Sequence, residues 1–195
     1  MTVRDTQPSG ASPELPDGLE LPRPPGAIRR FLQRRPWVAD ALVEAGFATR
    51  KPPGRAIVYA ATRKRVKSAY DRLRKAGIKA AWYHAGRSDS ARANAQKAFE
   101  QGKNPVLVAT CAFGMGVDMP DVRLVAHVQA PGTLESYYQE AGRAGRDGEP
   151  ARCVLLYAPG DAVTQARLRG TSPPPGAESG WRALQDYVFA VRCRQ

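Results

Sequence analysis

Apolar and polar positions follow two alternating periods along the middle of the chain. Short apolar runs fit buried strands, and after most of them the apolar residues recur every three or four positions, as on one face of a helix. Strands that alternate with helices of this length predict a parallel α/β sheet flanked by helices, with right-handed crossovers. The expected strands cover 56–60, 79–83, 105–109, 124–128 and 153–157, and the expected helices cover 63–76, 88–101 and 134–141.

The sequence on either side of this alternation has a different character. The first 26 residues contain six prolines and few apolar side chains, which favours a flexible leader. A helix is expected from Pro36 to Ala45, with Gly46 as its stop, and a last helix is expected to carry Trp181 and Leu184 after a Pro-rich linker at 171–180. The predicted organisation is therefore a leader at 1–26, a helical lead-in at 27–53, a domain at 54–170, and a linker with a final helix at 171–195.

Positive charge is concentrated in one block. The chain carries a formal net charge of +12. Most of this excess lies in residues 50–79, which contain eleven Lys or Arg residues and one acidic residue, Asp71. Such a block attracts polyanions, of which nucleic acid is the commonest. Considered alone, it fits a solvated helix face as well.

Other features limit where the protein works. No run of eighteen apolar residues occurs, and the N-terminus lacks the apolar segment of a secretory signal, so neither membrane insertion nor secretion is expected. Cys111, Cys153 and Cys193 form no closely spaced pair, which favours a reducing cytoplasm over a disulfide framework.

The segment YYQEAGRAGRDG, from Tyr137 to Gly148, is the richest in candidate chemistry. Arg143 and Arg146 stand three apart between glycines, directly after the helical pattern. Guanidinium groups are planar, permanently charged and able to bind phosphate with two hydrogen bonds. The glycines let the backbone turn sharply and approach a partner closely. The alternative is a basic, glycine-rich turn after a surface helix.

A second segment, VLVATCAFGMGVDMPDVR from Val106 to Arg123, leads from an expected strand into a glycine-containing loop. Ligands bind open α/β sheets at the carboxyl ends of their strands. This segment resembles motif V of superfamily 2 helicases, and the segment from Tyr137 to Gly148 resembles motif VI. The string QExGRAGRDG with AFGMGVD before it resembles the RecQ family of DNA helicases. The resemblance covers about residues 54–161. It implies the second RecA-like domain of such a motor.

The resemblance also implies what is missing. A complete motor needs a phosphate loop of the form GxxxxGK[ST] and an acidic magnesium motif, and the sequence contains neither. In the RecQ family these parts lie on a preceding RecA-like domain, with ATP between the two. ATP and Mg²⁺ are therefore expected to bind only when that ATPase domain is supplied in cis or in trans, and the chain alone should be inactive.

The resemblance assigns roles to individual residues. It implies that Arg146 is an arginine finger, with Arg143 as companion and Gln139 linking the phosphate region to the domain interface. Gly114, Gly116 and Asp118 would lie on the nucleotide, although Asp118 also fits a cap of the turn before Pro120. The candidates for gripping a DNA backbone at strand ends are Thr62, Arg63, His84, Arg87 and Thr110. A lone histidine such as His84 fits a structural role equally well.

The end of the chain resembles the start of a four-cysteine zinc subdomain, with Cys193 as an orphan ligand, so no complete zinc site is expected. The chain is thus expected to be half of a 3′–5′ DNA helicase of repair or recombination, truncated at both borders. Two alternatives remain: a stand-alone domain that binds nucleic acid or docks onto a helicase, and a basic RNA-binding accessory protein whose arginines are structural.

Overall fold

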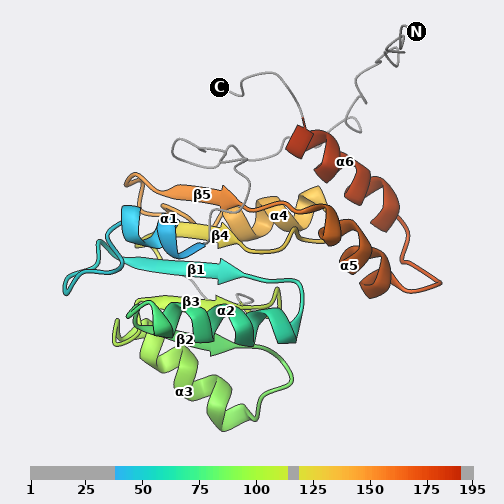
Figure 1. Ribbon diagram of the computed structural model, residues 1–195. Coiled ribbons are helices and arrows are strands. Elements are labelled where there is room, and N and C mark those ends of the chain that lie inside the picture. The colour runs from blue at the N-terminus through green and yellow to red at the C-terminus, as the bar shows by residue number, and fades with distance from the viewer. Residues whose placement is uncertain (1–37, 114–118, 190–195) are drawn as a thin grey trace, which may run out of the picture.

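The computed structural model describes residues 38–113 and 119–189 and contains a five-stranded sheet with helices on both faces (Figure 1). The strand order is β2-β3-β1-β4-β5, and every neighbouring pair is parallel. The predicted fold class is confirmed. The strands are β1 (Arg55–Tyr59), β2 (Ala80–Tyr83), β3 (Val106–Ala109), β4 (Val122–His127) and β5 (Arg152–Leu155), and the helices are α1 (Val38–Glu44), α2 (Arg63–Lys75), α3 (Asp89–Glu100), α4 (Leu134–Ala141), α5 (Pro159–Arg169) and α6 (Ala177–Phe189).

The central strand β1 is buried on both sides, which is why its sequence is a continuous apolar run. Ala56 and Val58 face a core that α1 and α2 cover. Ile57 and Tyr59 face a second core that α3, α4 and α6 cover. The sheet therefore separates two layers of helices, and the two motifs from the sequence lie in the second layer.

Polar side chains begin three of the helices. Thr62, Ser88 and Thr133 each stand in extended backbone just before a helix, and each hydroxyl accepts a hydrogen bond from the N–H three residues later. The expected cap at Thr133 is confirmed, with a distance of 3.1 Å to the Ser136 nitrogen. These caps fix the direction in which α2, α3 and α4 leave the carboxyl edge of the sheet.

Helix α5 was not predicted, and α6 begins at Ala177, inside the segment predicted as linker. The reason lies in the polar buried face of α5. Its large apolar residues Val163 and Leu168 are exposed, while Asp161 and Gln165 are buried. Both buried side chains bind the loop after β4: Asp161 accepts from the Ala130 nitrogen, and Gln165 donates to the Ala130 carbonyl at 2.6 Å.

Several sequence-based expectations fall outside the described residues. These are the leader at 1–26, the start of the first helix at Pro36, the candidate nucleotide residues Gly114, Gly116 and Asp118, and Cys193.

Candidate functional site

The carboxyl ends of β1, β2 and β3 bring several of the expected nucleic-acid residues to one edge of the sheet. Thr62 follows β1, His84 follows β2 and Thr110 follows β3; the Thr110 nitrogen donates to the Tyr83 carbonyl at 3.3 Å, which extends the ladder by one residue. The Thr62 hydroxyl caps α2 and also donates to Oε1 of Gln129, after β4, at 3.3 Å. Gln129 therefore joins this edge, although the sequence did not single it out.

His84 lies in a compact group with two arginines, Arg63 and Arg87, at this edge. The His84 Nδ1 accepts a hydrogen bond from the Gly86 nitrogen at 3.1 Å, which places the proton of the neutral ring on Nε2. Gly86 leaves room for Arg63, because a Cβ there would lie 2.6 Å from the Arg63 Nη1. Burial, followed by the charges of Arg63 and Arg87, lowers the pKa of His84 below its ordinary value of 6.5.

This lowered pKa predicts an acid-sensitive contribution to stability. The unfolded chain takes up a proton at His84 at higher pH than the folded protein does, so stability falls as the pH drops through about 6.5. Between about pH 7.5 and about pH 5.5, the melting temperature of the wild type should fall further than that of His84→Gln. Thermal denaturation followed by circular dichroism measures both. Parallel losses in the two proteins would show that His84 titrates alike in the folded and unfolded states.

The segment around the two motif VI arginines lies against the start of β4, at the opposite, amino edge of the sheet. The Gly145 nitrogen donates to the carbonyl of Val122 at 2.9 Å, and Gly145 has a φ of 64°, which favours glycine. Arg143 and Arg146 line a small hollow together with Ile57, Phe113, Met119 and Val122. The structure therefore brings motif VI and the described ends of motif V together.

The three motif VI candidates differ in exposure. Arg146 is exposed and Arg143 is half-buried. Gln139 is exposed on α4, where its amide donates to Glu135 at 3.1 Å, one turn back along the helix. Arg143 reaches towards the core: burial raises the pKa of the Tyr59 hydroxyl, and the charge of Arg143 together with a hydrogen bond from its guanidinium opposes that rise.

A buried polar pair joins the end of β4 to the end of α4. His127 Nε2 and Glu140 Oε2 are 2.7 Å apart, and the two side chains are 1% and 10% exposed. The His127 ring packs between Tyr59 and Tyr137, with centroid distances of 5.4 Å and 5.1 Å. Because Glu140 precedes Arg143 by less than one helical turn, this pair fixes the end of α4 to β4. The sequence placed Glu140 only within a helical pattern and did not foresee the partner.

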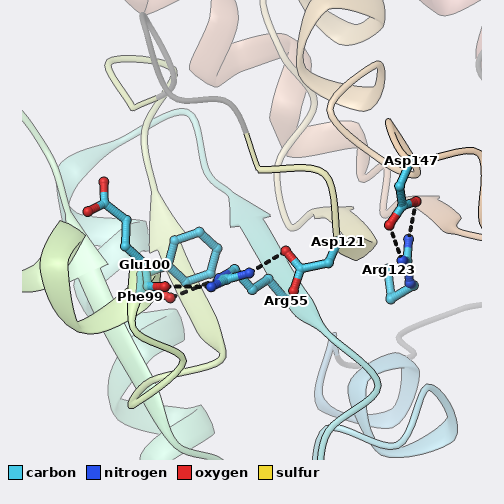
Figure 2. A network of polar contacts seen from close by, with 6 residues as sticks. All are labelled: Arg55, Phe99, Glu100, Asp121, Arg123 and Asp147. Carbon is cyan, nitrogen blue, oxygen red and sulfur yellow. Dashed lines mark hydrogen bonds and ion pairs between the residues drawn. The ribbon is translucent and has the colours of Figure 1, made fainter.

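Two ion pairs hold the loops at the amino edge, as Figure 2 shows. Arg55, at the start of β1, pairs with Asp121 and also donates to the carbonyl oxygens of Phe99 and Glu100. Arg123, at the start of β4, binds both carboxylate oxygens of Asp147, one of them at 2.9 Å. Bidentate pairs of this kind carry geometric specificity. Asp147 directly follows Arg146, so the second pair fixes the backbone from which Arg146 projects.

The candidate residues thus form two groups rather than one site. The strand-end group lies at the carboxyl edge, and the arginine group lies towards the amino edge on the face that carries α4 and α6. Tyr59 connects them, because it ends β1 and lies beside Arg143.

Two other kinds of feature are absent from the described parts of the chain. Residues 38–113 and 119–189 contain no cluster of three His, Cys, Asp or Glu side chains that could hold a metal ion. None of the helices in the same ranges is long and apolar enough to cross a membrane.

Comparison with known proteins gives one consistent family. The model of the helicase conserved C-terminal domain matches residues 37–148. The ATP-dependent DNA helicase RecQ of Bacillus subtilis is 50% identical over 143 residues, which cover 71% of this chain and 24% of that protein. The RecQ-like DNA helicase blm-1 of Caenorhabditis elegans is 46% identical over 117 residues, or 60% of this chain and 12% of that protein. The chain therefore spans a quarter or less of these relatives.

Solved structures agree on the fold. The chain superposes on S. cerevisiae Dbp5 bound to RNA and ADP BeF3 with a TM-score of 0.54, at 22% identity over 79% of this chain and 37% of that one. The E. coli DEAD-box protein SrmB, bound to regulator of ribonuclease activity A, gives a TM-score of 0.53 at 29% identity, over 62% of this chain and 68% of that one. Family model, sequence relatives and fold agree, and the chain belongs to the helicase conserved C-terminal domain family, with the sequence of a RecQ helicase C-terminal domain.

Proposed function

We propose that this domain is the second motor domain of a RecQ-like 3′–5′ DNA helicase that acts in DNA repair or recombination on cytoplasmic, nucleoid-associated DNA. One observation carries the proposal. Arg143 and Arg146 line the same hollow as the described ends of the motif V segment, and the backbone beneath them is fixed by the Arg123–Asp147 pair. Two permanent cations on a held loop suit a phosphate chain.

The nucleotide would be ATP with Mg²⁺, held mainly by a first RecA-like domain in cis or in trans. Exposed Arg146 suits a finger that reaches across an interface, while half-buried Arg143 suits a support at its base. Bound ATP supplies a phosphoryl group on which negative charge develops during hydrolysis, and a guanidinium near that group stabilises the charge. Gln139 is exposed on α4, four residues before Arg143, which follows the end of that helix, and is available to the interface.

The strand-end group would grip single-stranded DNA. Thr62, Arg63, His84, Arg87 and Thr110 follow the ends of three neighbouring strands, and the N–H groups at the start of α2 point outward there. Hydroxyl and guanidinium groups in such positions bind phosphate oxygens and do not read base sequence. The grip is therefore expected to be electrostatic.

A second candidate function is a stand-alone domain that binds nucleic acid or docks onto a complete helicase. The observation that favours it is the charge of α2, which exposes seven cations along thirteen residues: Arg63, Lys64, Arg65, Lys67, Arg72, Arg74 and Lys75. ATP hydrolysis discriminates the two functions. A motor domain should restore DNA-stimulated hydrolysis when mixed with or fused to a first RecA-like domain, whereas a stand-alone binder should not.

Binding of single-stranded DNA should be weak and strongly salt-dependent. Each phosphate that the protein neutralises contributes a slope of roughly −0.7 to the logarithm of the binding constant against the logarithm of salt concentration. Fluorescence anisotropy with a labelled oligothymidylate, titrated at several salt concentrations, measures this slope. An affinity that stays constant from low to moderate salt would contradict an electrostatic grip.

A further inference from the structure

The edge strand β2 carries an aromatic and cationic cluster that the grip at the strand ends does not explain. Trp82 is half-buried and packs on the face that α2 covers. Its ring centroid lies 6.0 Å from that of Tyr70 on α2 and 5.1 Å from that of His84. β2 is an edge strand and has only β3 as a neighbour in the sheet, so this cluster lies at the outer edge of the sheet.

Two cations lie over the same ring. The Arg87 Cζ is 4.0 Å from the Trp82 ring centroid, and the Arg87 guanidinium also donates to the Trp82 carbonyl. The Lys67 Nζ lies 5.7 Å from the Trp82 centroid and 5.3 Å from the Tyr70 centroid. Such contacts are cation–π interactions. An indole with a stacked guanidinium presents two flat groups on which a nucleic-acid base can stack.

We propose that Trp82 and Arg87 form a stacking site for one base of single-stranded DNA. With this site, the bound DNA continues from the carboxyl ends of the β-strands onto the outer side of β2. The inference rests on the proposed function and deepens it. In the bound state the base takes the place of the Arg87 guanidinium on the indole face, and the released guanidinium binds the adjacent phosphate. The site thereby exchanges a cation–π contact for a base stack and a charge-assisted hydrogen bond.

The position of the cluster determines which nucleic acid fits. His84 belongs both to the strand-end group and to the aromatic cluster, and Arg63 lies against Gly86 between them, so one backbone can follow both without a break. The stacked base must be unpaired, since both faces of a base are covered inside a duplex. An acidic peptide satisfies the cations but offers no flat ring to stack on the half-buried indole. The cluster therefore fits a single strand.

The test separates base stacking from attraction to phosphate. Wild type, Trp82→Ala and Trp82→Phe are titrated by anisotropy with an oligothymidylate and with a strand of equal length that lacks bases. Alanine should weaken binding of the intact strand by about 5- to 150-fold, the range for the loss of one stacked base. Phenylalanine should restore most of this loss, and on the abasic strand the three proteins should bind alike. Melting temperatures confirm that the variants fold.

A matched control comes from the opposite layer. Phe189 on α6 is 57% exposed, and Phe189→Ala should bind both strands as the wild type does. Oligothymidylate should also quench tryptophan fluorescence in the wild type more strongly than in Trp82→Phe. Equal binding of intact and abasic strands by the wild type would overturn the stacking site while leaving the electrostatic grip in place. Competition by polyglutamate as strong as by DNA would show a surface for polyanions in general and would also overturn it. Neither result affects the restoration of ATP hydrolysis, which tests the motor function separately.

Discussion

In a protein that contains both RecA-like domains, Arg146→Ala should reduce DNA-stimulated ATP hydrolysis by about 10³- to 10⁵-fold, the effect that arginine fingers have in related phosphoryl transfer. DNA affinity should stay nearly unchanged, because a finger acts on charge that develops in the transition state, whereas other groups hold the strand. Arg146 is suited to this role since it is exposed and projects from a loop that Asp147 and Gly145 fix to β4. Steady-state hydrolysis at saturating DNA, with anisotropy for DNA binding, measures both quantities.

Three controls distinguish an arginine finger from a residue that binds DNA or only supplies positive charge. Arg146→Lys should not restore hydrolysis, because a point charge lacks the planar fork of a guanidinium. Arg63→Ala should weaken DNA binding and alter hydrolysis mainly through that loss. The unmodified chain alone should hydrolyse no ATP. If Arg146→Ala lowered DNA affinity and spared hydrolysis at saturating DNA, the roles of the two groups would be reversed, and a fall in melting temperature alone would make the segment structural.

The second large effect is expected at the buried pair of His127 and Glu140. Glu140→Ala leaves His127 without its partner in a fully buried position, and breaking a buried pair in this way costs about 3 kcal/mol. For a protein of this size the melting temperature should fall by roughly 6–12 °C. Glu140→Gln should cost less, because its amide oxygen still accepts a hydrogen bond from the His127 Nε2–H. Thermal and urea denaturation of the isolated domain measure these differences.

A double variant separates the pair from its surroundings. Removing both polar partners, as in His127→Phe with Glu140→Leu, should be much less costly than the sum of the single changes, since no buried group then lacks a partner. Additive costs would mean that the two side chains contribute independently. Arg143 lies in the turn directly after α4, so loss of DNA-stimulated hydrolysis in Glu140→Gln at unchanged stability would further show that the pair orients the arginines.

Much of the fold follows from local pattern, and particular residues show why. The apolar run Val106–Ala109 fits a short buried strand and forms one, and Thr133 caps α4 at the position predicted from the sequence. Helix α5 was not predicted because hydrophobic periodicity indicates a helix only where apolar residues form its buried face. In α5 the buried residues are the polar Asp161 and Gln165. Their burial is possible only because the backbone of Ala130, far away in sequence, supplies their hydrogen-bond partners.

The candidate site divides in the same way. The motif arginines were recognisable because glycine spacing and charge are local properties, and the strand-end residues followed from the position of each strand. Two pairs were not recognisable from the sequence, because their partners are far apart along the chain. His127 and Glu140 are 13 residues apart, and Arg123 and Asp147 are 24 residues apart. No one-dimensional pattern marks such partners; they follow only from the way α4 and the loop after it pack against β4.

The strand order has a consequence for how the chain folds during its synthesis. β1 and β2 are made first, yet they do not pair with each other, because β3 lies between them. No part of the sheet can form until β3 has left the ribosome, when β3 can pair with both of the earlier strands at once. Until then the apolar residues of β1 have no partner strand, a state that exposes a nascent chain to aggregation. A pause in translation while β3 is still inside the ribosome should therefore increase aggregation far more than a pause after β4 has also emerged, when β1, β3 and β4 can pair with one another.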